Sequence, residues 1–316
     1  MIIKQLEYRQ NENSIYFHHS TEEKSPETIK LKTEAHSAYE VFYLHEGDVE
    51  YIIEGIKVRV FPGNVLIINQ AAMHSIVKNM RHGDYERSVL QFSKNSLPSN
   101  HPEIFNLLDE LFSVKGRRQY LLLPKSIVEK TEINDIFTKI EALCEHSQND
   151  KYFIPYLVSH IIMLVIGICK GHALLEKNAT DETVQQNPLV LSCIDYINKH
   201  IDSVLSVDEL ADALNISKYY LSHTFSKHME ISLKQYVLLK KMWRAKNLIE
   251  SGKSAYEVSI QLGYSYYSSF YHAYVSVIGH SPTNKEANPS PANFLEIGEQ
   301  KEKAPKHRGR KRKTTE

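Results

Sequence analysis

The stretch Ser206-Val-Asp-Glu-Leu-Ala-Asp-Ala-Leu214 is followed 48 residues later by Ser254-Ala-Tyr-Glu-Val-Ser-Ile-Gln-Leu262, and the two share one pattern. In each copy, Glu stands three residues after the opening Ser, and such a pair can satisfy the free N–H groups at a helix start reciprocally. The apolar residues that follow keep to one helical face. Each copy therefore predicts a short helix that begins just after its Ser.

A turn and a second helix follow each short helix. The turns are Asn215–Ser217 and Gly263–Ser265, and the Ser of each turn is expected to cap the next helix. Helix, short turn and helix form the helix-turn-helix pattern, whose second helix can enter a DNA major groove. The offset between the copies grows from 48 to 49 residues after the turn, so the second turn is one residue longer. The apolar core pairs of the second helices are Leu221 with Phe225 and Phe270 with Tyr274.

One amphipathic helix is expected between the two copies, from Ser232 to Ser251. At a rise of about 1.5 Å per residue it would be about 30 Å long. One turn of DNA measures about 34–36 Å. A stiff connector of this length would hold two recognition helices in successive major grooves on one face of a duplex.

The segment from Leu191 to Pro282 resembles the DNA-binding domain of the AraC/XylS family of bacterial transcription regulators. The resemblance implies a cytoplasmic regulator without catalytic activity or cofactor. Its implied partners are double-stranded DNA, a small-molecule effector such as a sugar, RNA polymerase and a second copy of the chain, with no membrane. Activation is expected rather than repression. The residues that carry the resemblance are Leu210-Ala211, Leu221, Phe225, Ala245, Leu248, Val258, Gly263-Tyr264-Ser265, Phe270, Tyr274, Gly279 and Ser281-Pro282.

The family pattern implies that exposed residues beside each core pair contact DNA bases, although an ordinary solvated helix face is the alternative. His223 and His272 stand where family members often have Arg, and a neutral imidazole offers one donor where Arg binds guanine with two. The expected base contacts are Tyr219, Ser222, His223, Tyr267, Ser268, Tyr271 and His272. The expected phosphate contacts are Ser217, Lys218, Lys227, Arg244 and Ser265.

Charge is unevenly distributed along a chain whose 38 Lys and Arg balance 38 Asp and Glu. Residues 181–287 carry 10 basic against 11 acidic residues. Because phosphate neutralisation supplies much of DNA affinity, a nearly neutral DNA-binding segment must rely on local positive charges. Besides the lysines and the arginine already named, the candidates are Lys240, Lys241 and Lys246.

The last residues, 288–316, carry 8 basic against 4 acidic residues and are expected to be disordered. They end in the basic run Lys306–Lys313. Within it, Arg308, Gly309 and Arg310 are typical of an accessory arm that enters a narrow minor groove. A solvated charge run is the alternative.

The first hundred residues show a β pattern, with short apolar runs separated by turn signals such as Pro62-Gly63-Asn64, which predicts a sandwich or small barrel. Tyr39–Gly47, Phe61–Ile68 and His74 resemble the cupin-like sensor domain found ahead of many AraC-type regulators. The expected strands are Ser14–His18, Thr28–Leu31, Val41–Leu44, Val49–Ile53, Lys57–Phe61, Val65–Ile68 and Ser88–Phe92.

Three polar residues in this β region, His36, Glu40 and His74, are candidates for the lining of an effector pocket. Two His and one Glu also match the facial set that holds a metal ion in some enzymes, and plain structural roles are a third alternative. The pocket is preferred and no metal is expected, because Ala38 stands where cupin enzymes have a further His.

The expected fold class is α+β and multidomain: a cupin-like β-barrel, a helical dimerisation section and an all-α double helix-turn-helix domain. Three cysteines without Cys-x-x-Cys spacing fit a reduced cytosolic chain. The competing interpretations are a cupin metal enzyme with an accessory DNA-binding domain, and an architectural DNA protein. The expected divisions are 1–100 for the β domain, 101–176 for the helical section, 177–188 for a linker, 189–287 for the DNA-binding domain and 288–316 for the tail. The other expected helices are Ile104–Leu111, Lys125–Cys144, Tyr152–Leu175 (buried or dimer-forming) and Leu189–Ile201.

Overall fold

The computed structural model describes residues 2–10, 15–23, 28–30, 33, 35–36, 38–79, 84–93, 96, 102–113, 119–146, 150–171, 184–203, 206–229 and 231–284. The strands are β1 (Ile2–Gln10), β2 (Ile15–Glu22), β3 (Thr28–Lys30), β4 (Tyr39–Glu46), β5 (Val49–Ile53), β6 (Ile56–Val60), β7 (Val65–Ile68), β8 (His74–Asn79), β9 (Tyr85–Phe92), β10 (Tyr120–Leu123) and β11 (Val184–Gln186). The helices are α1 (Pro102–Ser113), α2 (Lys125–Val128), α3 (Ile133–His146), α4 (Asp150–Gly171), α5 (Pro188–His200), α6 (Val207–Ala213), α7 (Lys218–Met229), α8 (Leu233–Glu250), α9 (Ala255–Gln261) and α10 (Tyr267–Ile278).

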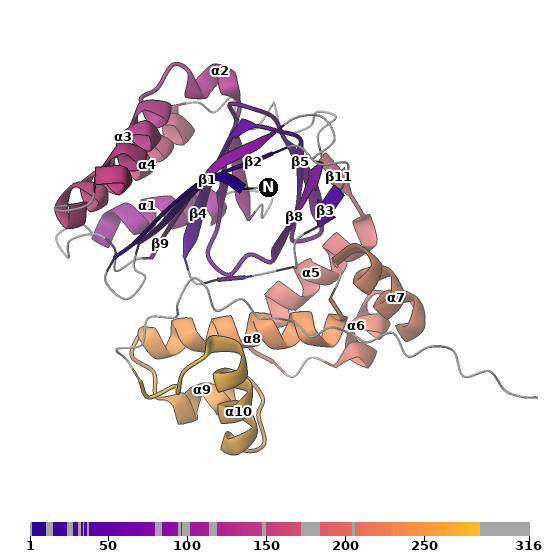
Figure 1. Ribbon diagram of the computed structural model, residues 1–316. Helices are drawn as coiled ribbons and strands as arrows, with labels where there is room; N and C mark the ends of the chain where they lie inside the picture. The colour runs from indigo at the N-terminus through magenta and orange to yellow at the C-terminus, as the bar shows by residue number, and fades with distance from the viewer. Residues whose placement is uncertain are drawn as a thin grey trace, which may run out of the picture.

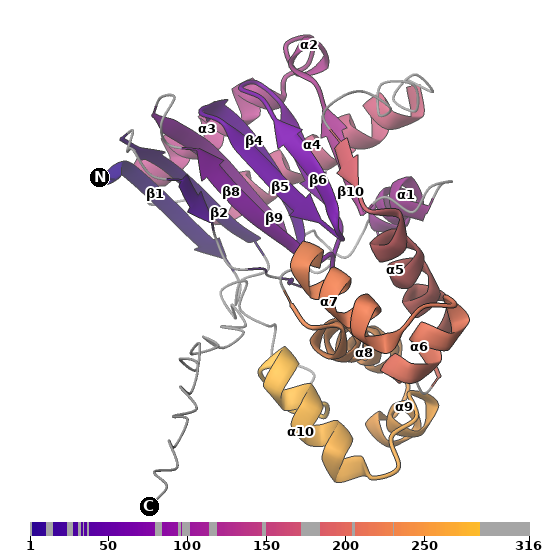
Figure 2. The same ribbon diagram turned by 90° about the vertical axis from the view of Figure 1, so that its right-hand side faces the viewer.

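The N-terminal part, here called the β unit, consists of two antiparallel sheets (Figure 2). One has the strand order β1-β2-β9-β4-β7-β10 and the other β11-β6-β5-β8-β3. Successive side chains of a strand point to opposite faces, so β4 contributes to two cores. Phe42 and Leu44 pack with residues of both sheets, whereas Val41 and Tyr43 pack with the helices that cover the six-stranded sheet.

Helices α1, α3 and α4 cover the outer face of the six-stranded sheet (Figure 1). Helix α4 buries Ile154, Val158 and Ile161 in this layer and exposes Tyr152 and Tyr156. Its span 152–170 is apolar and long enough to cross a membrane by length and composition, but 44% of it is buried inside the protein. Burial against α1, α3 and the sheet accounts for this apolar composition in a packed core helix.

The C-terminal helices, α5 to α10, form a separate all-α layer whose long axis is α8 (Figure 1). Helix α8 is unbroken and begins after the capping residue Ser232, which confirms the predicted connector. Its 18 residues give a length of about 27 Å. Helices α6 and α7 lie toward one end of α8 and helices α9 and α10 toward the other (Figure 1).

Several sequence expectations for the β unit were incomplete. Strands β1, β8 and β10 were not predicted, and β10 follows α1 in the chain yet joins the edge of the sheet beside β7. The range expected to be linker contains β11, whose Val184 pairs with Val58 of β6. A polar run can still form a strand when an unpaired sheet edge supplies backbone partners. The basic tail, including Arg308, Gly309 and Arg310, lies outside the described residues.

Candidate functional site

The first helix-turn-helix unit, α6 and α7, begins with the predicted capping box. Ser206 Oγ accepts from Glu209 N at 3.1 Å, and Ser206 N donates to Glu209 Oε2 at 2.7 Å. At the turn, Ser217 Oγ accepts from Tyr220 N at 3.2 Å, so this predicted cap is also confirmed. Leu221 and Phe225 are fully buried, which fixes the face that α7 turns toward the protein.

The opposite face of α7 carries the residues expected to contact bases. Tyr219 is 81% exposed. His223 is exposed and its ring stacks on that of Tyr219, with centroids 6.1 Å apart, while Ser222 is half-buried. The structure thus presents an aromatic ring and an imidazole side by side on one exposed helix face.

The second unit, α9 and α10, repeats the capping box but changes the turn. Ser254 Oγ accepts from Glu257 N at 3.2 Å. The prediction that Ser265 caps α10 was wrong: the capping position is Tyr266, without a side-chain hydrogen bond. The extra residue in this turn moves the helix start one position along the chain, so Ser265 falls outside the cap.

Helix α10 presents its expected base contacts in the same way as α7. Ser268, Tyr271 and His272 are exposed, and Tyr267 is half-buried against Phe270. The rings of Tyr271 and His272 lie edge to face at 5.9 Å. Both second helices therefore offer a Tyr and a His to solvent beside a buried apolar pair.

Most of the local positive charges have partners inside the protein. Arg244 makes two hydrogen bonds of 2.9 Å with Asp202, and Lys218 Nζ lies 2.8 Å from Asp208 Oδ2. Lys241 Nζ donates to Leu262 O at 2.9 Å. These pairs account for the near neutrality of the segment, since its cations also serve to hold helices together.

Three lysines offered by the sequence as free positive charges are buried or partly buried, which corrects that expectation. Burial lowers the pKa of both Lys241 and Lys246. Lys240 pairs with Glu54. Lys227 is exposed on α7, as expected for a phosphate contact.

The candidate effector residues do come together, inside the β unit. His36 Nε2 lies 3.2 Å from Glu40 Oε2, and His74 Nε2 lies 3.9 Å from the same oxygen. Gln91 Nε2 donates to Glu40 Oε2 at 2.8 Å. Burial raises the pKa of the Glu40 carboxyl, but the hydrogen bond with His36, the charges of His74 and His36 and the Gln91 amide together lower it to about 2. The cluster therefore holds an ionised carboxylate in an apolar interior.

A buried contact, here called the Glu54 clasp, joins the β unit to the C-terminal helices. Glu54, 4% exposed, accepts from the Tyr236 hydroxyl and from Lys240 Nζ, the latter at 3.0 Å. Burial, with the nearby Glu54 charge, raises the pKa of Tyr236 well above its usual value, so its hydroxyl remains a donor. The neighbouring Gly55 packs against Val190 and Met229, where an added Cβ would lie 2.9 and 3.0 Å from their side chains.

The Glu54 clasp also touches the effector cluster. Glu54 Oε1 accepts from Met73 N at 3.0 Å, and Met73 directly precedes His74. Met73 itself packs in the core of the C-terminal helices. One residue thus connects the polar cluster to the surface on which α8 is held.

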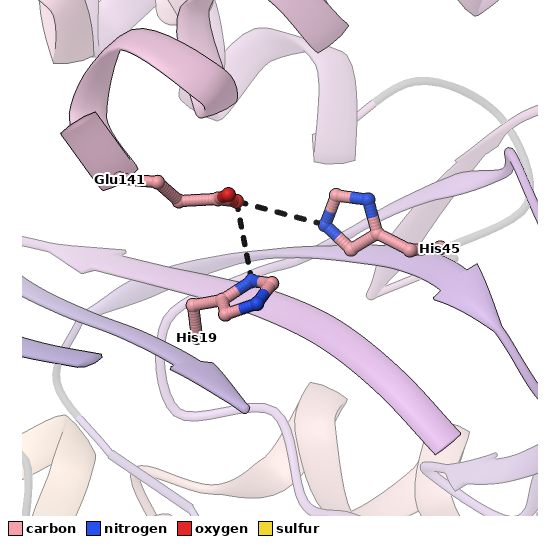
Figure 3. A group of neighbouring side chains, drawn as sticks. All are labelled: His19, His45 and Glu141. Carbon is pink, nitrogen blue, oxygen red and sulfur yellow. Dashed lines mark ion pairs between the residues drawn. The ribbon is translucent and has the colours of Figure 1, made fainter. Parts of the chain in front are cut away.

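A second polar cluster, here called the outer cluster, was missed by sequence reasoning. His19 of β2, His45 of β4, Ser88 of β9 and Glu141 of α3 meet on the helix-covered face of the six-stranded sheet (Figure 3). Burial lowers the pKa of His45 to about 4. Burial raises the pKa of Glu141, but hydrogen bonds with His19 and Ser88 outweigh it and the net shift is downward.

Comparison with known proteins identifies the C-terminal helices. Residues 210–287 match the family described as "Helix-turn-helix domain". The Msm operon regulatory protein of Streptococcus mutans is 31% identical over 116 residues, which cover 35% of this chain and 42% of the relative. The melibiose operon regulatory protein of Escherichia coli is 20% identical over 78% of this chain and 80% of its own.

Two further matches differ in how much they cover. The probable transcriptional regulator LumQ of Photobacterium leiognathi is 36% identical over 28% of this chain and 36% of its own, so this match and the Msm match each span less than half of the relative. Fatty-acid-bound ToxT of Vibrio cholerae aligns with 88% of this chain and 97% of its own at 12% identity, with a TM-score of 0.36. The sequence matches place the chain in the AraC/XylS family through its C-terminal helix-turn-helix domain, residues 210–287.

Proposed function

We propose that this protein is a sequence-specific DNA-binding transcription regulator that acts in the cytoplasm and is controlled by a small molecule. The observation that carries the proposal is the pair of capped helix-turn-helix units at the two ends of one unbroken helix of about 27 Å. That length is comparable to one turn of DNA, about 34–36 Å. Tyr219 and His223 on α7 and Tyr271 and His272 on α10 would reach base edges.

The effector would bind at His36, Glu40 and His74 in the β unit, which we propose to be a cupin-like barrel. An ionised carboxylate, two imidazoles and an amide suit a ligand rich in hydroxyl groups, and the Tyr51 ring beside His74 offers an apolar face. Two relatives are named for the melibiose and lactose operons. These features together support a sugar as the class of effector and activation as the sign of regulation.

Control of DNA binding would run through the Glu54 clasp. A ligand that displaces His74 also displaces Met73, because the two are adjacent in the chain. Met73 N donates to Glu54, and Glu54 holds Tyr236 and Lys240 of α8. An effector that binds more tightly when this contact is open would shift the population toward C-terminal helices released from the β unit.

A second copy of the chain is the proposed partner of the helical layer, and RNA polymerase is the proposed partner of the DNA-bound complex. Helix α4 exposes Tyr152, Phe153, Tyr156 and Met163 although its other face is buried. Pairing of this exposed apolar face between two copies would give a homodimer that places four helix-turn-helix units along one operator.

The test is DNA binding by the full chain, measured by fluorescence anisotropy on fragments from upstream of its own gene and on scrambled DNA of equal length. We expect tighter binding to the genomic fragment. Replacing both His223 and His272 with Ala should weaken that binding by about tenfold or more, since a good base contact contributes about 1–3 kcal/mol.

The matched control for these substitutions is His160→Ala, since His160 lies on α4 and pairs with Glu132. It should leave DNA affinity unchanged. Equal affinity for genomic and scrambled DNA would contradict the proposal. An unchanged affinity and sequence preference in the double variant would refute the assignment of the two histidines.

A further inference from the structure

We propose that His19, His45 and Glu141, closed by the hydroxyl of Ser88, form a binding site for a divalent first-row transition-metal ion that links α3 to the six-stranded sheet. The ion-binding atoms of the two histidines and the glutamate all lie within 4.8 Å of one another. Figure 3 shows both rings directed toward the Glu141 carboxylate, with dashed lines from it to each.

Strand geometry explains why these side chains converge. His19 pairs with Ser88 across β2 and β9, and side chains of paired residues point to the same face. His45 lies in β4 at an irregularity in its pairing with β9, between Leu44 and Glu46. Such irregularities redirect a side chain, and here the His45 ring comes within 5.5 Å of the His19 ring.

The distances match those of a tetrahedral site. His19 Nδ1 lies 3.2 Å and His45 Nε2 3.8 Å from the same atom, Glu141 Oε1. Bonds of about 2.0–2.2 Å at tetrahedral angles place neighbouring ligand atoms about 3.3–3.6 Å apart. The observed values bracket that range, so small side-chain rotations would be sufficient to bind an ion.

The Ser88 hydroxyl completes the geometry. Its Oγ lies 3.0 Å from His19 Nδ1, 2.8 Å from His45 Nε2 and 2.8 Å from Glu141 Oε1. An oxygen at nearly equal distance from three ligand atoms stands above the triangle they form. Ser88 can therefore supply a fourth oxygen, directly or through water, to an ion bound at the centre.

The surroundings of His19 resemble those of metal-bound histidines. Its other ring nitrogen, Nε2, faces Glu86 Oε1 at 3.6 Å, and a carboxylate behind a ligating imidazole is the usual way to orient it. Two nitrogens and one carboxylate suit zinc and its neighbours better than the oxygen-preferring Mg²⁺ or Ca²⁺. His19 is 2% exposed, whereas Glu141 is 17% and His45 20% exposed, so these two residues offer an entry path.

The outer cluster differs from the His36–Glu40–His74 cluster in what it would connect. The effector cluster lies within the β unit, whereas the outer cluster spans three strands and α3. A bound ion would fasten the proposed dimerisation helices to the sheet. The inference does not depend on the proposed function, because metal binding is measured without DNA.

The experiment uses the full chain after treatment with a chelator and dialysis. Zn²⁺ binding is measured by titration calorimetry and by the shift in melting temperature, and Co²⁺ binding by visible absorption that reports tetrahedral coordination. We expect one Zn²⁺ per chain at this site. Glu141→Gln and His45→Ala should each lower the affinity by at least about tenfold, the loss typical even for residues that only orient a ligand.

Two controls make the result specific. His160→Ala removes a histidine that pairs with one carboxylate, at 3.5 Å from Glu132, and should keep full affinity. His74→Ala should also keep it. Absence of saturable Zn²⁺ binding, or binding lost in His74→Ala and kept in Glu141→Gln, would overturn the proposal. Circular dichroism without metal identifies a variant that fails to fold, and the other variant then decides.

Discussion

The two helix-turn-helix units share their capping boxes and differ in what holds them. The first lies beside the Glu54 clasp, where Gly55 packs against the end of α7 and Glu54 holds the N-terminal half of α8. The second is tied to α8 itself, through the hydrogen bond from Lys241 to Leu262 O. The β unit therefore has a direct hold on the first unit, and its influence on the second must pass along α8.

The largest effect is expected from breaking the Glu54 clasp. Glu54→Gln leaves the Lys240 charge and the Tyr236 hydroxyl in a buried site without their anionic partner, which costs about 3–5 kcal/mol in comparable buried pairs. Urea unfolding should show this loss. DNA affinity in the absence of effector should then resemble that of the effector-bound wild type.

Asp202→Asn is the matched control, because Asp202 binds Arg244 on the same helix α8 in an exposed pair. Exposed pairs contribute only about 0–1 kcal/mol. A loss of stability as small in Glu54→Gln as in this control would show that the β unit does not hold the first helix-turn-helix unit.

A smaller effect is expected from Gly55→Ala. Gly55 has φ of 76°, and its added Cβ would meet Val190 and Met229. We expect a loss of about 2–3 kcal/mol, about 1 from the backbone conformation and the rest from the forced repacking. Thermal unfolding provides the measurement.

Gly252→Ala separates the two contributions. Gly252 has φ of 102° and nothing within 4 Å of its added Cβ, so only the backbone cost applies there. Equal losses for the two glycine variants would mean that the packing of Gly55 on the C-terminal helices contributes nothing.

The smallest effect separates the two turns themselves. Ser217→Ala should cost about 1 kcal/mol, because Ser217 caps α7, whereas Ser265→Ala should cost close to nothing. Both variants unfold with circular dichroism as the readout. A cost for Ser265 that matches the cost for Ser217 would contradict the shifted cap of α10.

The features that the sequence predicted are those that depend on neighbours in the chain. The capping box of Ser206 and Glu209 and the connector helix follow from residues three or four apart, and both are present. The cap at Ser265 failed because one inserted residue changes where a helix starts, which spacing reveals only as a difference in turn length.

The contacts that escaped prediction join residues far apart in the chain. Glu54 and Tyr236 are separated by 182 positions, and Ser88 and Glu141 by 53. Strand alternation places His19 on the face of Ile15 and Phe17, but only the packing of α3 shows that Glu141 lies opposite it. The same limit explains why Lys240 could not be recognised as a buried charge.

The most direct test of the central claim is a base-interference footprint of the full chain on its operator, compared with His223→Ala and His272→Ala. The account predicts, for each copy of the chain, two major-groove patches on one face of the duplex, about 10–10.5 base pairs apart. His223→Ala should erase one patch and His272→Ala the other. A single patch, or loss of the same patch in both variants, would contradict two recognition helices held one DNA turn apart by α8.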